Sequence, residues 1–244
     1  HGDIDPCKAL MKSCNDVMMH MAADLGATRF AKYVRSFGFG SKTGIDLPGE
    51  AEGGIFSKEK LHQVELATSS FGQGQTVTMI QLASAFSAVI NGGNYYQPHV
   101  VKEINSESGA VVSSNDNTLV KRVVSEDASK LIRKYLEKTV EDDEGTANPA
   151  RVKGYVIGGK TGTAEKWPRN EGKYLVSFMG FAPYDNPQVL IYVVVNEPNV
   201  ADQPHSVFAQ NIAREILEEV LPYMNIYPDE KKTGVNKGYD VTGS

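Results

Sequence analysis

The chain has 244 residues, of which 41% are hydrophobic and 23% charged, and its net charge is −5. This composition is ordinary for a soluble globular protein with one large domain or two small ones, and the negative balance argues against a nucleic-acid partner. No apolar run approaches the ~20 residues that cross a bilayer, and residues 1–10 lack the layout of a signal peptide. If the native protein is anchored in a membrane or exported, we expect the segment responsible to lie outside this chain.

The cysteines and histidines do not form a recognisable framework. If Cys7 and Cys14 share one helix, their Cα atoms lie ~10 Å apart, which is too far for a disulfide. The five histidines are scattered, without the short Cys/His spacings that zinc prefers. We expect neither a metal site nor a cofactor.

The first half of the chain is predicted to be mainly helical. A helix begins at Asp5 and Pro6, is interrupted at residues 13–15 by Ser-Cys-Asn, and resumes until Gly26. The following elements are a helix at 28–37, an ordered glycine-rich loop at 37–54, a helix that Ser57 caps and a buried helix at 78–93.

The second half is predicted to contain strands and two helices. A strand over 95–104 and a hairpin or loop precede a helix that Ser125 begins. Strand candidates follow at 151–164, 174–183 and 188–198, and the links between them are too short for helical crossovers, so the strands are expected to be antiparallel. The closing helix is expected to place six apolar residues against that sheet: Val207, Phe208, Ile212, Ile216, Val220 and Leu221.

Together these elements indicate an α+β fold. We expect one domain over residues 1–224, with a mainly helical lobe at 1–95 and a sheet with flanking helices at 96–224. The tail at 225–244 is polar and aperiodic, and it is expected to be mobile.

Residues 154–161 satisfy G-x-x-x-x-G-K-[ST], the pattern of a phosphate-binding loop. That motif requires a buried strand before its first glycine and a helix that starts at the Lys-Thr pair. Here proline and charged residues precede Gly154, strand formers occupy positions 155–157, and no helical periodicity follows Thr161. We therefore reject nucleotide binding and predict that Lys160 lies at the far end of a strand.

The string Lys160-Thr161-Gly162-Thr163 has a different chemical use. Lys160 and the Thr161 hydroxyl offer a cation and a donor to a carboxylate, and Gly162 lets a substrate backbone approach closely. An exposed Thr163 amide can donate to an oxyanion. K-T-G is one of three elements found in penicillin-binding proteins and class A β-lactamases, beside S-x-x-K and a Ser/Asp/Asn element.

Further segments occur in the order in which that family carries them. Ser13-Cys14-Asn15 resembles its S-x-N motif. The chain therefore resembles the C-terminal part of the transpeptidase domain of a class B penicillin-binding protein, of the cell-division and sporulation type. The other segments that carry the resemblance are residues 37–50, 67–74, 78–93, 144–147, 158–165 and 176–183.

The resemblance also shows what this chain lacks. In the family the nucleophilic serine belongs to an S-x-x-K motif before S-x-N, and here no serine precedes Ser13. Two formal substitutes, an S-x-x-K at 57–60 and a second K-T-G at 42–44, are better explained by helix capping and by a loop. We therefore expect the chain alone to be inactive and to expose apolar surface or to self-associate.

The family chemistry implies a role for each matching residue. The complete enzyme cross-links peptidoglycan stem peptides by serine acyl transfer at their D-Ala-D-Ala ends, and β-lactams imitate those ends. Ser13 would relay a proton and Asn15 would bind the substrate amide, although helix capping is an alternative role for both. Lys160 and Thr161 would hold the terminal carboxylate, and the Thr163 amide would form half of the oxyanion hole.

The resemblance also implies a setting and leaves other functions open. The protein would act at the extracytoplasmic face of a bacterial membrane, with a membrane anchor upstream of this chain and a glycosyltransferase as a partner. Alternatives are a non-catalytic module that binds β-lactams or stem peptides, and a scaffold of the cell-wall machinery. Glu165 is a carboxylate where many relatives have glutamine, and we expect it to slow acylation by anionic β-lactams if it faces the cleft.

Overall fold

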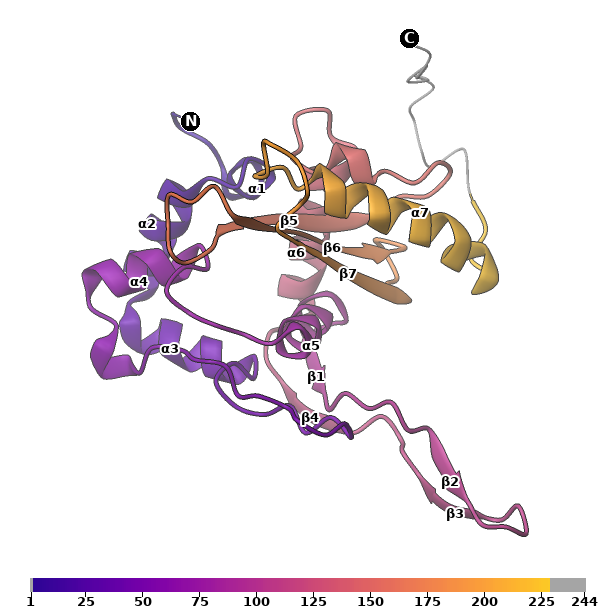
Figure 1. The fold of residues 1–244 in the computed structure, drawn as a ribbon. Helices are drawn as coiled ribbons and strands as arrows, with labels where there is room; N and C mark the ends of the chain where they lie inside the picture. The colour runs from indigo at the N-terminus through magenta and orange to yellow at the C-terminus, as the bar shows by residue number, and fades with distance from the viewer. Residues whose placement is uncertain (1, 229–244) are drawn as a thin grey trace. The chain divides into compact units, whose positions relative to one another are not determined.

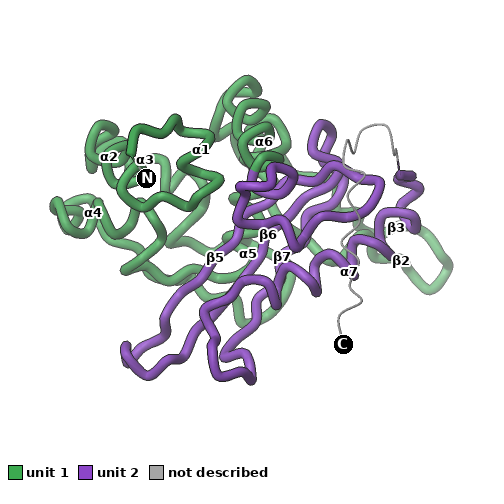
Figure 2. Tube along the Cα trace, turned by 90° about the horizontal axis from the view of Figure 1, so that it is seen from above, with its two compact units in different colours: residues 1–138 green, residues 139–244 purple. Residues whose placement is uncertain are grey.

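The structure is a computed structural model that describes residues 2–228, and the chain divides into two compact units, His1–Lys138 and Thr139–Ser244 (Figure 2). Both units combine helices with antiparallel strands, which confirms the α+β class. The division between the units falls within a helix, so the short strands after residue 93 belong to the first unit. Residues 229–244 of the predicted tail lie outside the described range.

The first unit begins with helices, as predicted. Pro6 is the first residue of the opening helix, and the Lys8 amide donates to the carboxylate of its N-cap, Asp5, at 2.8 Å. The chain then leaves helical geometry at residues 12–14, where the sequence predicts a break. The first five α-helices (Figure 1) are α1 (Pro6–Met11), α2 (Asn15–Leu25), α3 (Ala27–Ser36), α4 (Gln63–Ser70) and α5 (Met79–Ile90).

The glycine-rich loop between α3 and α4 is tied to the start of α5. Gln81 is fully buried and forms a capping box with Thr78. Its Nε2 donates to the carbonyls of Ser41 at 2.7 Å and Glu52 at 2.8 Å. The side chain of Gln81 thus satisfies the start of α5 and two carbonyls of the loop. These bonds hold the loop in one conformation, as the prediction of an ordered loop requires.

The prediction of a helix capped by Ser57 is wrong. Only a 3₁₀ turn, η1 (Lys58–Lys60), follows Ser57, whose side chain makes no capping hydrogen bond. Leu61 leaves the helical region with ψ at 69° and becomes 7% exposed. Burying a leucine gains about 2 kcal/mol against about 1 kcal/mol for a cap, so burial decides the local structure.

The strand predicted over residues 95–104 is divided in two. β1 (Asn94–Tyr96) pairs with β4 (Leu119–Arg122), and β2 (Glu103–Asn105) pairs with β3 (Val111–Ser114), both antiparallel. Between them Pro98 has no amide hydrogen, and the amides of Val100 and Val101 donate to the Asp46 carboxylate at 2.7 and 2.8 Å. The predicted hairpin is formed by β2 and β3, which extend as a two-stranded ribbon (Figure 1).

The second unit is built on a three-stranded sheet. α6 (Glu126–Glu141) crosses the boundary between the units, and η2 (Asn148–Ala150) follows it. β5 (Gly158–Glu165), β6 (Tyr174–Ala182) and β7 (Val189–Asn196) are antiparallel in the order β5-β6-β7, as the short links predict. α7 (Val207–Tyr223) covers one face of this sheet (Figure 1).

The buried face of α7 differs from the predicted one. Ile212 and Ile216 are 42% and 43% exposed. The sheet face that packs in this core already carries large side chains, among them Phe178 and Val193, which leave room for small residues on the helix. The α7 residues that are fully buried are Ala209, Ala213, Leu217 and Leu221.

β5 begins at Gly158, so the prediction that residues 155–157 belong to this strand is wrong. The Ile157 amide donates to Glu141 Oε1 at 3.1 Å, and the Val156 carbonyl accepts from the Tyr184 amide at 3.1 Å. Ile157 packs in the core of the unit, and Tyr155 packs against that core, so these strand-forming residues are wholly or partly buried without being part of a strand. Lys160 is therefore the third residue of β5 and lies near its start.

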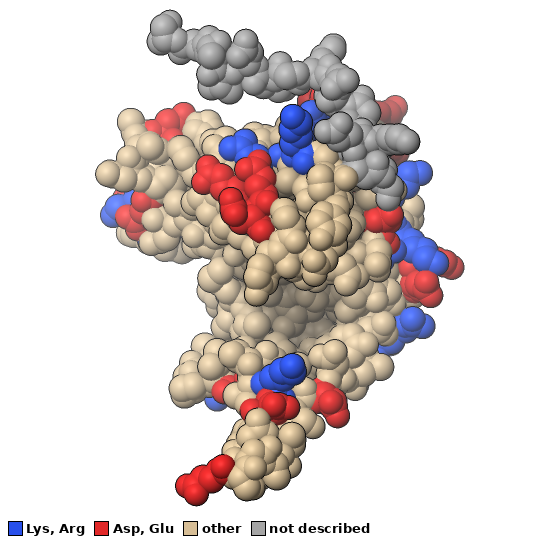
Figure 3. Space-filling model, turned by 90° about the vertical axis from the view of Figure 1, so that its right-hand side faces the viewer, with Lys and Arg blue, Asp and Glu red and all other residues tan. Residues whose placement is uncertain are grey.

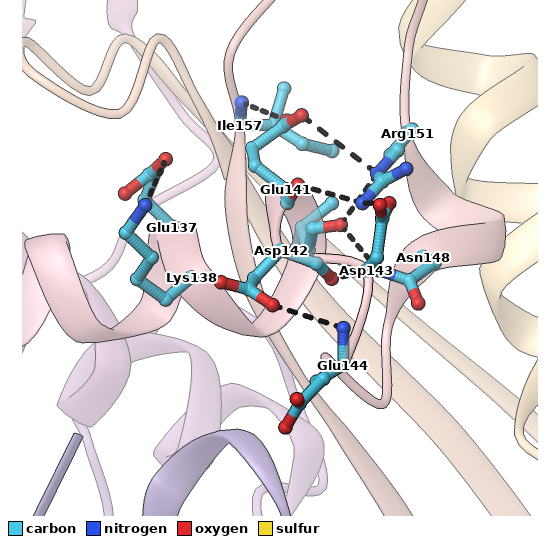
Figure 4. A network of polar contacts seen from close by, with 10 residues as sticks. Glu137, Lys138, Glu141, Asp142, Asp143, Glu144, Asn148, Arg151 and Ile157 are labelled. Carbon is cyan, nitrogen blue, oxygen red and sulfur yellow. Dashed lines mark hydrogen bonds and ion pairs between the residues drawn. The ribbon is translucent and has the colours of Figure 1, made fainter. Parts of the chain in front are cut away.

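A polar network closes the end of α6 and fixes the turn that follows (Figure 4). Arg151 donates through Nε to the Val140 carbonyl at 2.8 Å and through Nη2 to the Glu141 carbonyl at 2.7 Å. The Asn148 side chain donates to the carbonyls of Val140 at 2.9 Å and Asp142 at 2.5 Å. These donors satisfy carbonyls that a helix C-terminus otherwise leaves without partners.

Replacing Arg151 with alanine is expected to lower the free energy of unfolding by about 1–3 kcal/mol, because the Glu141 carbonyl loses its donor and the Val140 carbonyl keeps only Asn148. Chemical denaturation of the 244-residue chain measures the change. Exposed Lys153 lies two residues away, and its replacement by alanine is the control. Equal stabilities of the two variants would contradict the capping role.

The charged side chains on one face of the molecule are of mixed sign (Figure 3). On the face in Figure 3, lysine and arginine side chains are scattered among acidic ones, without a broad basic area. No group of three or more His, Cys, Asp or Glu residues in the described part of the chain is placed to hold a metal ion. No helix between residues 2 and 228 is long and apolar enough to cross a membrane.

Candidate active site

The S-x-N motif forms the connection between α1 and α2 in the first unit. The Cys14 amide donates to the Ala9 carbonyl at 2.9 Å, and Ser13 adopts φ of 50°, which is uncommon for a residue with a side chain. Cys14, rather than Ser13 or Asn15, occupies the N-cap of α2 and makes no side-chain capping bond. Ser13 instead caps the end of α1, because its amide donates to the Leu10 carbonyl at 3.2 Å while its backbone is left-handed. Both Ser13 and Asn15 are exposed at this turn.

The K-T-G motif lies on β5 in the second unit, and the strand register decides which of its groups face outward. Just after β5, the Lys166 amide donates to the Lys173 carbonyl at 2.9 Å, and the pairing with β6 has no bulge. Backbone N–H and C=O groups alternate in direction along an antiparallel ladder, so those of the even-numbered residues of β5 point toward β6. The N–H and C=O groups of Thr161 and Thr163 point to the opposite side. The Thr163 amide therefore lies on the outer edge of β5.

The end of α6 covers only the start of this outer edge. The Thr139 hydroxyl donates to the Gly159 carbonyl, next to the bond between Glu141 and the Ile157 amide. Beyond Gly159, no described strand pairs with β5 on this side. An extended peptide can therefore add to the edge from Thr161 onward.

The Lys160 ammonium group lies at the same edge. It donates to the Thr161 carbonyl at 3.1 Å and approaches the Thr161 hydroxyl at 3.5 Å. Burial lowers the pKa of Lys160 from 10.5 to about 8. The group is thus mostly protonated at neutral pH, where it attracts a carboxylate, yet it releases a proton more readily than an ordinary lysine.

Thr146 is a site residue for which the sequence reasoning gave no role. Its hydroxyl lies 3.4 Å from the Thr161 hydroxyl, and its carbonyl accepts from Gln210 Nε2 of α7 at 3.5 Å. Gln210 is 2% exposed, and its amide also donates to the Ser206 hydroxyl at 3.0 Å. The signal was available, because residues 144–147 carry the resemblance, but the contact depends on the turn after α6.

Gly162 and Glu165 have neighbours that the sequence did not reveal. A Cβ added at Gly162 would lie 2.6 Å from the Ser177 hydroxyl of β6. The Glu165 carboxylate accepts from the Asn170 amide at 2.7 Å, so it is directed into the loop between β5 and β6. The expectation that Glu165 slows acylation by anionic β-lactams remains a prediction, and this bond supplies another role for the carboxylate.

The rejection of a phosphate-binding loop is confirmed, because a strand rather than a helix contains Lys160. Gly154 has φ of 86°, and a Cβ there would lie 2.4 Å from Pro228. A Cβ at Gly159 would lie 2.5 Å from the Phe178 ring. Packing accounts for both glycines of the pattern.

The second K-T-G, at 42–44, serves its loop. The amides of Thr43 and Gly44 donate to the Glu50 carboxylate at 2.6 and 3.1 Å, and the Thr43 hydroxyl donates to it at 2.5 Å.

The predicted catalytic residues are divided between the two units. Ser13 and Asn15 lie in the first unit, and Lys160, Thr161, Gly162 and Thr163 lie together in the second.

The fold and the K-T-G edge agree with a family comparison. Residues 1–218 match the family model of the penicillin binding protein transpeptidase domain, and the chain belongs to this family. It is 41% identical over 245 residues to stage V sporulation protein D of Bacillus subtilis, covering 98% of this chain and 37% of the relative. It is 29% identical to the penicillin-binding protein PbpB of Mycolicibacterium smegmatis, covering 88% of this chain and 35% of that protein.

Solved structures show the same fold. Penicillin-binding protein 3 of Mycobacterium tuberculosis in complex with aztreonam superposes with a TM-score of 0.84 at 27% identity, over 91% of this chain and 52% of that one. The transpeptidase domain of penicillin-binding protein 3 of Burkholderia pseudomallei superposes with a TM-score of 0.80 at 27% identity, over 91% of this chain and 65% of that one. The chain spans little more than a third of the curated relatives described above, so the activity of the whole protein is a proposal.

Proposed function

We propose that this chain is the substrate-binding part of a serine-type D,D-transpeptidase that acts on peptidoglycan stem peptides. The supporting observation is the outer edge of β5, where an ammonium group, a hydroxyl and an outward amide follow one another from Lys160 to Thr163. Lys160 and Thr161 hold the terminal carboxylate of D-Ala-D-Ala or of a β-lactam. The Thr163 amide stabilises the negative charge that develops on the attacked carbonyl oxygen.

The reaction needs a nucleophile that these residues do not supply. A serine from an upstream S-x-x-K segment attacks the carbonyl of the penultimate D-alanine, and the peptide bond to the last D-alanine breaks. Ser13 relays a proton to the departing amine, while Asn15 binds the substrate amide. An amine from a neighbouring stem then attacks the acyl-enzyme, which forms the cross-link and frees the serine.

A fluorescent penicillin tests this division of labour. The 244-residue chain is expected to form no covalent adduct, whereas the protein extended upstream through its S-x-x-K segment is labelled and migrates as a fluorescent band after denaturation. The extended protein with its S-x-x-K serine changed to alanine is the control. Labelling of the short chain would place the nucleophile among these 244 residues and sink the proposal.

A second candidate is a module that binds stem peptides or β-lactams, or scaffolds the cell-wall machinery, without turnover. The outward edge of β5 favours it equally, because binding requires only Lys160, Thr161 and Thr163. Absence of an S-x-x-K segment from the complete protein would select this candidate. In either case we place the protein at the extracytoplasmic face of the membrane, where peptidoglycan lies, with an upstream anchor and a glycosyltransferase partner.

A further inference from the structure

Trp167, the single tryptophan of the chain, is 85% exposed. It lies two residues beyond β5, in the link to β6. Tryptophan offers the largest apolar surface of any side chain, and proteins generally bury most of it. A solvent-exposed indole on an ordered loop is therefore an apolar surface that can bind a ligand.

The loop that carries Trp167 is closed by hydrogen bonds that do not use the indole. The Glu165 carboxylate accepts from the Asn170 amide at 2.7 Å, and the Lys166 amide donates to the Lys173 carbonyl at 2.9 Å. The Lys166 ammonium group also pairs with Glu197, next to the end of β7. These bonds fix both ends of the loop, while Trp167 stands outside them.

The geometry of β5 gives a bound stem peptide a single direction. Thr139 and Glu141 already occupy the edge at Gly159 and Ile157, so a peptide with its carboxylate at Lys160 and Thr161 extends only toward Thr163 and Glu165. Its amino end, which is joined to the sugar of peptidoglycan, therefore runs toward the loop between β5 and β6. At ~3.3 Å per residue, a stem of about five residues brings its amino end ~13–17 Å along the strand, level with residues 164–166, so that the attached sugar is the group that reaches Trp167.

Two of the three basic side chains of the loop, those of Lys166 and Lys173, form ion pairs with carboxylates. Lys166 pairs with Glu197, and Lys173 pairs with Glu171 at 2.8 Å. A surface with these paired charges and an exposed indole suits a neutral ligand that has an apolar face, and the C–H face of a pyranose ring is such a surface. A polyanion would find the ammonium groups of Lys166 and Lys173 already paired.

We propose that Trp167 binds the sugar that carries the stem peptide, by stacking its indole against the pyranose ring while the peptide lies along β5. This inference rests on the proposed function and extends the site beyond the D-Ala-D-Ala end. Trp167 is thereby a specificity-determining residue that favours sugar-linked stems over free peptides.

Calorimetric titration of the 244-residue chain with two ligands tests the inference. The ligands are N-acetylmuramoyl-pentapeptide and the same pentapeptide without the sugar. The native chain is expected to bind the sugar-linked ligand at least fivefold more tightly, and that ligand should also change the intrinsic fluorescence of Trp167. Trp167→Ala should reduce this preference to less than twofold, and Trp167→Phe should restore part of it.

Tyr223 supplies a matched control, because it is an aromatic residue that is 87% exposed at the end of α7. Tyr223→Ala should leave both affinities unchanged. Equal binding of the two ligands by the native chain would overturn the sugar site and leave the proposed function intact. Failure of both ligands to bind would overturn the proposed function and this inference together.

Discussion

Replacing Lys160 with methionine is expected to make the folded chain more stable at neutral pH and to slow acyl transfer in a protein extended upstream to include the proposed nucleophile. Methionine keeps the unbranched shape of the side chain but carries no charge to desolvate. The fall in the pKa of Lys160 from 10.5 to about 8 measures the penalty that burial places on the charge. Because the side chain keeps some contact with water, we expect a gain of about 1–2 kcal/mol in the free energy of unfolding.

The stabilisation should depend on pH in a defined direction. Below pH 8 Lys160 is protonated in both folded and unfolded chains, so the penalty is complete. Between pH 8 and 10.5 the unfolded chain holds more protons than the folded one, and the stability of the native chain therefore rises relative to that of the variant. The difference in unfolding free energy between Lys160→Met and the native chain should shrink over this window.

Denaturation at pH 7 and at pH 10 measures both effects. Exposed Lys153→Met is the control, and it should change stability little at either pH. In a protein extended upstream to include the proposed S-x-x-K segment, Lys160→Met should slow acylation by penicillin by about 10²-fold or more, because the carboxylate of the penicillin loses its cation. A variant that is less stable than the native chain at pH 7 would show that the lysine charge is stabilised rather than penalised in the fold.

Structural elements that depend on residues close together in the sequence could be predicted, whereas those that depend on distant contacts could not. Helix α5, the break before α2 and the antiparallel strands β5 to β7 were predictable, because neighbouring residues or short links specify them. The prediction at Ser57 failed because the burial of Leu61 overrode a local capping signal. The conformation of residues 155–157 is likewise set by hydrogen bonds to residues distant in sequence, such as Tyr184 and Ile226, and not by their strand propensity.

The candidate site shows the same distinction. Motif spacing placed Lys160 and Thr163 on a strand, but only the register with β6 shows that the Thr163 amide faces outward. Thr146 reaches Thr161 through the turn that Arg151 and Asn148 hold at the end of α6. No periodicity or spacing encodes that contact, since it depends on where a helix ends in three dimensions.

Replacing Gly162 with alanine is expected to lower the free energy of unfolding by about 1–3 kcal/mol, because the new methyl group meets a neighbouring strand. The added Cβ would lie 2.6 Å from the Ser177 hydroxyl, whereas the Ser177 Cβ is 4.0 Å away, an ordinary contact. The same hydroxyl bonds to Tyr192, so it does not turn aside without cost. Acylation of the extended protein should fall with stability, because Gly162 lies between Thr161 and Thr163.

A second substitution separates packing from substrate binding. Ser177→Ala removes the colliding oxygen, so Gly162→Ala combined with Ser177→Ala should be more stable than the sum of the single changes allows. The Cβ at position 162 is directed at Ser177 rather than at the open edge of β5, and acylation should therefore recover together with stability. Recovery of stability without recovery of acylation would show that the substrate itself needs the glycine, as the sequence motif implies. Thermal denaturation and penicillin labelling of the four proteins decide between the two roles.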